Sequence, residues 1–385
     1  MMKRYKELLQ YSLTVLLSVL FLILGWLLVQ DKAALFQNTS GCNSEEVLCQ
    51  VLEITDDDQT IGALGDMYYL ERKIEFDAQI LRGSRKGQII SVVQQIDNVT
   101  TLGVEAVEIG DRIFAYSTET EGEVSWSAGD YYRSGQIGWL IAFFCLALLL
   151  FGRRKGFHTV LSLALTCAAV FVVFVPSILA GYNPYLWSCL TCLYVIVMTL
   201  ALVSGFSRKS LASALGCAGG VLVAGIMTTV MSALMKLSGF VDDDSLYVYL
   251  LNPDQPIDLK SIIFAANIIG ALGATMDVAM SLSSSLYELS EQAPDLSFAE
   301  MFRSGIHIGQ DIMGTMANTL VLAYIGSSLS TVLLFVSYQA SLLQLLNREL
   351  IIVELLQALS GSIGILFTIP ISALIASFLY RKKTC

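Results

Sequence analysis

Charged side chains and prolines are scarce in this chain of 385 residues. Only 15% of the residues are charged and six are proline, whereas 55% are apolar and the mean hydropathy is +0.65. A soluble globular protein usually has about a quarter of its residues charged. The composition therefore excludes that class and predicts a membrane protein, with the lipid bilayer as its first partner.

Basic surfaces and nucleotide-binding motifs are also missing from the sequence. Against 33 acidic residues there are 23 basic ones, and residues 31–133 alone hold 19 acidic and eight basic side chains. This balance opposes binding to nucleic acid. Walker A, His-Glu-x-x-His and Gly-x-Ser-x-Gly motifs do not occur, so ATP-driven transport would need another chain. We predict no nucleic-acid partner, no cofactor and no enzymatic activity.

Long apolar segments dominate the chain instead. The first runs from Tyr11 to Val29 and is either a signal peptide or an uncleaved anchor; its length, enough to cross a bilayer, favours the anchor. Together with seven later segments it predicts a polytopic α-helical membrane protein of about eight spans. The seven lie at roughly 136–151, 157–180, 185–204, 210–235, 261–285, 305–328 and 353–379.

Basic residues at the ends of these spans predict the orientation. With the N-terminus inside, twelve Lys and Arg residues lie at cytoplasmic ends and three lie outside, apart from the acidic segment 31–133. Lys and Arg near span ends resist translocation, so we predict a cell-membrane protein with both termini cytoplasmic. A ninth span at 329–350 would move the Arg381-Lys-Lys383 cluster outside. We therefore expect an extension or a re-entrant segment there.

A small extracytoplasmic domain is predicted between the first two spans. The chain divides into an anchor at 1–30, a β-rich domain at 31–134 and a seven-span domain at 135–385. Short alternating runs within the second part indicate a barrel-like fold of about five strands. Cys42 and Cys49 lie in this domain, where they form a local disulfide or remain two thiols; their spacing does not decide between these.

Carboxylates occur deep inside only two predicted spans, the sixth and the seventh. In the sixth, Asp277 and Ser281 share a helix face with Gly270 and Gly273. Glycines on that face allow close approach of another helix, so we expect Asp277 to point into the bundle.

The seventh span carries a second polar face. His307, Asp311, Thr315 and Asn318 recur at helical spacing. A charge at mid-bilayer costs about 2.5 to 3.5 kcal/mol on insertion scales, so carboxylates there need compensation or a purpose. They predict an ion, proton or substrate site in which Asp277 and Asp311 pair. The alternative is that these groups only lock helices together.

Four methionines accompany these polar groups, at positions 276, 280, 313 and 316. Methionine in a span is more often core filler than a ligand, although thioethers beside carboxylate and amide oxygens would suit a transition-metal ion. Whether a metal binds is therefore left open.

Several strings in the chain resemble the YibE/F-like family of bacterial multispanning membrane proteins. They are Gly273-Ala-Thr-Met-Asp-Val-Ala-Met-Ser281, Ser304-Gly-Ile-His-Ile-Gly-Gln-Asp-Ile-Met-Gly-Thr-Met-Ala-Asn-Thr-Leu320, Leu322-Ala-Tyr-Ile-Gly326, Asp130-Tyr-Tyr-Arg133 and Gly181-Tyr-Asn-Pro184. The resemblance implies a bacterial cell-membrane protein. It carries over no catalytic or binding residues.

Three functional classes fit the sequence. An ion- or proton-coupled transporter or permease explains the many spans and the paired carboxylates together. A non-catalytic assembly or signalling subunit would use the outer domain to bind a membrane partner or a second copy. An intramembrane aspartyl protease also needs two facing carboxylates. However, neither Asp277 nor Asp311 lies in a Gly-x-Gly-Asp or Tyr-Asp motif, which makes this the remote alternative.

Overall fold

The computed structural model describes residues 2–30, 45–64, 67–97, 104–120, 123–250, 256–337 and 341–380. The chain forms two compact units, one of residues Phe36–Ala147 and one of Met1–Leu35 with Leu148–Cys385. The first contains a β-barrel, and the second consists of helices. This composition confirms the predicted class, a helical membrane protein with a small β-rich domain.

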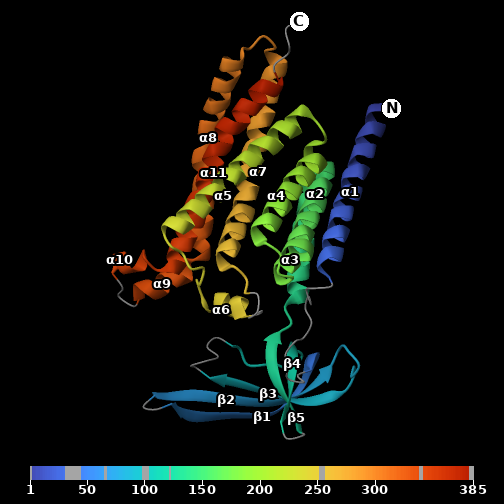
Figure 1. Ribbon diagram of the computed structural model, residues 1–385. Helices are drawn as coiled ribbons and strands as arrows, with labels where there is room; N and C mark the ends of the chain where they lie inside the picture. Colours follow the sequence, from blue (N-terminus) through green and yellow to red (C-terminus); the bar gives the residue numbers. More distant parts are fainter. Residues whose placement is uncertain are drawn as a thin grey trace. The chain divides into compact units, whose positions relative to one another are not determined.

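Five strands form the barrel, which is closed in the order β1-β2-β3-β5-β4. Neighbours are antiparallel except β3 and β5, which pair in parallel through Val92–Val93 and Trp126–Ser127. The predicted barrel of about five strands is confirmed. The strands are β1 (Glu46–Leu64), β2 (Met67–Ile80), β3 (Ile89–Asp97), β4 (Arg112–Thr120) and β5 (Glu123–Tyr131), shown in blue to green in Figure 1.

Alternating side chains fill the barrel core. Phe76, Ala78 and Ile80 of β2 point inward at every second position, as strand geometry requires. Cys49 of β1 is fully buried with them, and its thiol donates to the Ile113 carbonyl oxygen at 3.5 Å. Cys42 lies outside the described residues, so both alternatives, a disulfide with Cys49 and two thiols, stay open.

Helices make up the second unit. Their bounds are α1 (Met2–Val29), α2 (Ser134–Ala168, which begins in the barrel unit), α3 (Val175–Leu179), α4 (Pro184–Ser204), α5 (Arg208–Leu234), α6 (Asp243–Leu250), α7 (Leu259–Gln292), α8 (Phe298–Ser327), α9 (Leu329–Ser337), α10 (Leu342–Leu345) and α11 (Glu349–Tyr380), with a π-helical turn at Ala169–Phe174 between α2 and α3. Within the described residues, six helical segments are long and apolar enough to cross a membrane: Gln10–Val29, Ser134–Leu179, Pro184–Ser204, Arg208–Leu234, Leu259–Gln292 and Glu349–Tyr380.

The segment Ser134–Leu179 reverses its direction. Arg153 inside α2 has φ 49° and ψ −121°, which breaks the helix. A Cβ added at Gly156 would overlap the carbonyl oxygen of Leu148, although eight residues of straight helix would separate the two by about 12 Å. The two arms of α2 therefore fold back on each other, in line with two predicted spans. α8 is not among the six segments, so the count of eight spans stays a prediction.

Short helices occupy the region between α8 and α11. α8 ends at Ser327, α9 has nine residues and α10 has four. A span needs about 20 residues. Neither helix is long enough to cross a bilayer, which agrees with an extension or a re-entrant segment at 329–350.

Small residues hold α5 against α11 at the centre of the helical unit. A Cβ at Gly220 would overlap the Thr368 hydroxyl and lie 2.9 Å from the Gly364 carbonyl oxygen, and a Cβ at Gly216 would overlap the Ser372 hydroxyl. Small residues repeat every four positions on both helices, which lets two backbones approach closely in a membrane. This crossing, with α7 packed against both helices, is the core of the bundle.

Candidate functional site

The predicted face of α7 lies on the outside of the single chain. Gly270, Gly273, Asp277 and Ser281 are all exposed, and a Cβ at Gly273 would meet open space. The prediction that Asp277 points into the bundle is therefore wrong for one chain. α7 buries its other faces, with Met276 in the core shared with α4 and α5, and Val278 in the core shared with α8 and α11.

The polar face of α8 also points away from the bundle. His307, Asp311, Thr315 and Asn318 are exposed. The opposite face is tightly packed, since a Cβ at Gly305 would lie 2.8 Å from the Ala373 methyl group of α11. α8 is therefore amphipathic, with one face in the bundle and a face of carboxylate, imidazole, hydroxyl and amide groups outside it.

A capping box fixes the start of α8. The Ser297 hydroxyl accepts from the Glu300 backbone N–H, and the Glu300 carboxylate accepts from the Ser297 backbone N–H at 2.9 Å. The Ser297 hydroxyl also donates to the Glu300 carboxylate at 2.7 Å, and this bond together with the one from the Ser297 backbone N–H lowers the pKa of Glu300. The cap sets where the helix begins and hence which face each later residue occupies.

The structure brings the two polar faces onto neighbouring helices. α7 and α8 pack against each other, and the Tyr324 hydroxyl of α8 lies over Gly270 of α7. Within the described part of the chain, no hydrogen bond or ion pair joins Asp277 to Asp311. The predicted residues thus lie on two helices that pack together, but no direct contact joins the two carboxylates.

A buried polar cluster was missed by the sequence analysis. The Asn267 side chain of α7 donates to the Thr228 hydroxyl of α5, and to the Ser360 hydroxyl of α11 at 2.8 Å. All three residues are almost fully buried, and the Asn267 Oδ1 atom has no hydrogen-bond partner. The four-residue spacing of small residues in α5 and α11 was the available signal. The cluster ties three helices together behind the exposed face of α7.

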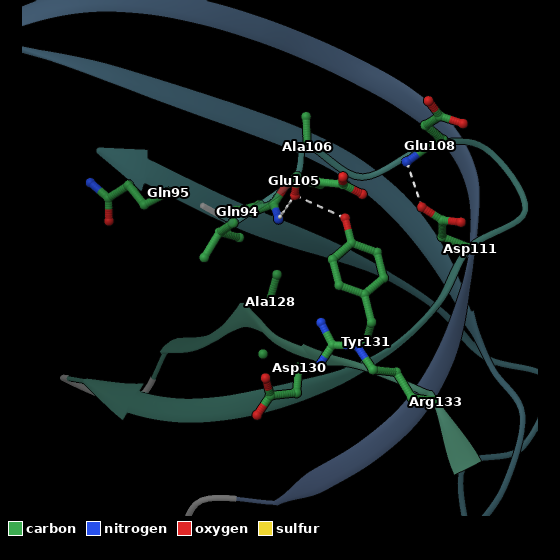
Figure 2. A pocket seen from close by; sticks show the side chains of 12 residues that line it. Gln94, Gln95, Glu105, Ala106, Glu108, Asp111, Ala128, Asp130, Tyr131 and Arg133 are labelled. Carbon is green, nitrogen blue, oxygen red and sulfur yellow. Dashed lines mark hydrogen bonds between the residues drawn. The ribbon is translucent and has the colours of Figure 1, made fainter. Parts of the chain in front are cut away.

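The barrel carries a separate acidic cavity of about 1130 Å³. Figure 2 shows the Tyr131 ring inside it, with the hydroxyl donating to the Glu105 carbonyl oxygen at 2.9 Å. Burial raises the pKa of Tyr131. Four carboxylates and one guanidinium line the cavity, an arrangement that favours cationic groups; they belong to Glu105, Glu108, Asp111, Asp130 and Arg133.

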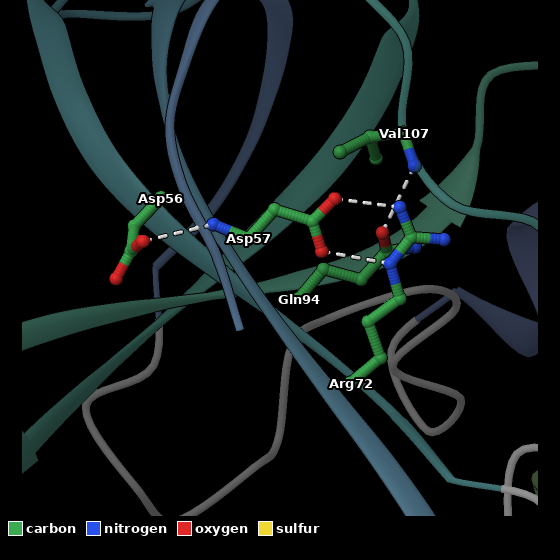
Figure 3. A network of polar contacts seen from close by, with 5 residues as sticks. All are labelled: Asp56, Asp57, Arg72, Gln94 and Val107. Atoms are coloured by element: carbon green, nitrogen blue, oxygen red, sulfur yellow. Dashed lines mark hydrogen bonds and ion pairs between the residues drawn. The ribbon is translucent and has the colours of Figure 1, made fainter. Parts of the chain in front are cut away.

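Polar contacts hold the segment that forms one wall of this cavity. The Gln94 side chain of β3 donates to the Glu105 carbonyl oxygen at 3.1 Å (Figure 2) and accepts from the Val107 backbone N–H at 3.0 Å (Figure 3). Nearby, Arg72 forms a two-point ion pair with Asp57, at 2.8 and 2.6 Å. The two hydrogen bonds of Gln94 take the place of strand pairing for residues 104–107, which belong to no strand.

Metal binding has little support from the residues that the structure describes. Among them, no group of three or more His, Cys, Asp or Glu side chains is placed to hold a metal ion. Met276 is buried and belongs to the apolar core between α4, α5 and α7, which fits its interpretation as core filler.

The apolar helices around a small-residue core, joined to a five-stranded barrel, define a multi-pass membrane protein. A family model described as YibE/F-like protein matches residues 140–382, and the chain belongs to this family. The match includes all six predicted site residues and leaves out the barrel strands and the Asp130–Arg133 string. Comparisons with curated proteins and with solved structures found no match.

Proposed function

We propose that this protein is an ion- or proton-coupled transporter of the cell membrane, and that the exposed polar faces of α7 and α8 form its path. The observation that carries the proposal is that two neighbouring helices present Asp277 and Asp311 on their outer faces. Each charge costs about 2.5 to 3.5 kcal/mol in lipid. Water or a bound ion along these faces would offset that cost.

The same proposal includes eight spans, cytoplasmic termini and an extracytoplasmic barrel. The reversal at Arg153 supports this arrangement, because Arg153, Arg154 and Lys155 gather at the turn between the arms of α2. Such a basic turn favours the cytoplasmic side. α8 then counts as a span in spite of its polar face.

A second candidate is an assembly or signalling subunit that binds a partner through the barrel. The acidic cavity around Tyr131 favours it, since a basic segment of another protein would complement the four carboxylates. In that case Asp277 and Asp311 serve only to hold helices together, and catalysis has no part in either candidate.

Current measurements on solid-supported membranes carrying the full-length protein separate the two candidates. A jump in proton or sodium concentration should give a transient current that Asp277→Asn and Asp311→Asn each abolish, because an amide cannot exchange a proton or neutralise a cation. Glu288→Gln, at the end of the same α7 helix, is the control and should keep the current. Absence of a current in the wild-type protein would refute the transporter, and amide variants with full current and changed thermal stability would refute the role of the two carboxylates.

A further inference from the structure

The outer face of α8 carries both signs of charge. Arg303, His307 and Asp311 follow each other at intervals of four residues, and all three side chains are exposed. Within the described residues none of them takes part in an ion pair. The face continues through Gly314, where a Cβ would meet open space, to Asn318.

Such a face is poorly suited to lipid. The bilayer core offers no hydrogen-bond partners, so exposed polar side chains there are expected to face protein or a water-filled cavity. The bundle does not supply that cover, because Gly305 and Gly309 turn the opposite face of α8 toward α11. Within the described part of the helical unit, nothing covers this face.

We propose that a second copy of this chain covers the α8 face, so that the polar path lies between two copies and is incomplete in one. A two-fold axis along the membrane normal brings the same surface of both copies together. His307 and Asp311 are about 6 Å apart along the helix, so two crossing α8 helices can pair Asp311 of each copy with His307 of the other. Opposite charges on one face make it complementary to itself.

Glycine and threonine on this face also suit a contact between copies. Gly314 has open space where a side chain would be, and Thr315 follows it with a short side chain. Small residues at an interface allow helices to approach closely in a membrane. A lipid chain needs neither the charges nor the short side chains, and a different membrane protein would need its own matching charges.

Photo-crosslinking in intact membranes tests this proposal. A benzophenone amino acid replaces Thr315 in the full-length protein, and the matched control carries it at Leu222, an exposed apolar position of α5. We expect irradiation to shift the Thr315 variant from 42.0 kDa to about twice that mass, with both peptides from this chain, and to leave the control unshifted. A monomer, a lipid adduct or a crosslink to another protein at Thr315 would overturn the proposal.

Charge exchange gives a second, independent result. In the Thr315 crosslinking background, His307→Asp or Asp311→His alone should abolish the dimer, because two carboxylates or two imidazoles then meet across the interface and the carboxylate–imidazole pairing is lost. The double exchange should restore it; if the single exchanges leave the dimer unchanged, the proposed pairing is wrong. The proposed path between the copies rests on the proposed transporter function, whereas the contact between the copies does not. Crosslinking reports the contact and the current reports ion binding, so each can fail alone.

Discussion

Single glycines decide how closely the central helices approach. Gly220 of α5 lies against Thr368 and the Gly364 backbone of α11, where backbone atoms cannot move without separating the helices. We expect Gly220→Ala to destabilise the protein by about 1 to 3 kcal/mol, the usual cost of overpacking. A thermal melt of the purified protein in detergent measures this as a lower midpoint.

Gly138→Ala is the matched control for that variant. A Cβ at Gly138 of α2 meets nothing within 4 Å, and alanine is the better helix former. Its midpoint should stay level or rise. Equal loss in both variants would contradict the close crossing of α5 and α11.

The thiol of Cys49 reports the packing of the barrel core. Burial raises its pKa to about 11, so little thiolate forms at pH 8. We expect iodoacetamide to leave Cys49 unmodified in the folded protein and to modify it after unfolding, as read by mass spectrometry. Modification that needs a reductant after unfolding would reveal a disulfide with Cys42. Rapid labelling of Cys49 in the folded protein would contradict its burial in the barrel core.

At the scale of elements, an ion pair between Asp57 of β1 and Arg72 of β2 joins these two paired strands. The bidentate hydrogen bond from Arg72 lowers the pKa of Asp57, so the pair stabilises the fold above the ordinary carboxyl pKa. This stabilisation is lost as the pH falls through the lowered value. Expressed alone, residues 45–132 should fold cooperatively and show this titration by NMR.

Arg72→Gln tests the cause of that shift. In this variant the Asp57 pKa should rise toward its ordinary value, while Lys73→Gln should change it much less, because Lys73 pairs with Glu75 at 2.7 Å. An isolated barrel without a cooperative transition would contradict its independence. An Asp57 pKa that ignores Arg72 would contradict the ion pair.

The periodicity of the sequence predicted the helices and strands better than it predicted which of them pack together. Alternation identified the barrel because Phe76, Ala78 and Ile80 must share one face of a strand. Helical spacing also grouped the polar residues of α7 and α8 correctly, since each group is found on one face. It did not show which face the bundle covers, because that depends on where other helices pack. Gly273 suggested a contact that the structure instead makes at Gly220 and Gly364.

Four-residue repeats of small side chains were the overlooked signal. Gly216, Gly220 and Ala224 in α5, with Gly364 and Thr368 in α11, mark the close crossing. In lipid the hydrophobic effect does not drive helices together, so small residues predict contacts better than apolar ones do. The position of Asn267 between these helices followed from the crossing and was not available from its own sequence context.

On the scale of the whole molecule, the helix bundle has a tightly packed centre and a proposed polar path on its outside. The proposed path runs over α7 and α8, on the outside of one chain, whereas the barrel and its acidic cavity form a separate unit. The central claim of the proposed function is therefore that water reaches residues on these faces at membrane depth.

Labelling of introduced cysteines with a membrane-impermeant, charged thiol reagent tests this claim most directly. Gly273→Cys and Ser281→Cys lie on the exposed polar face of α7, and Leu222→Cys lies on an exposed apolar face of α5. Thiolate forms only where water reaches, so the account predicts labelled peptides at the first two positions and an unlabelled peptide at the third. Unlabelled cysteines at 273 and 281, or equal labelling at all three positions, would contradict it.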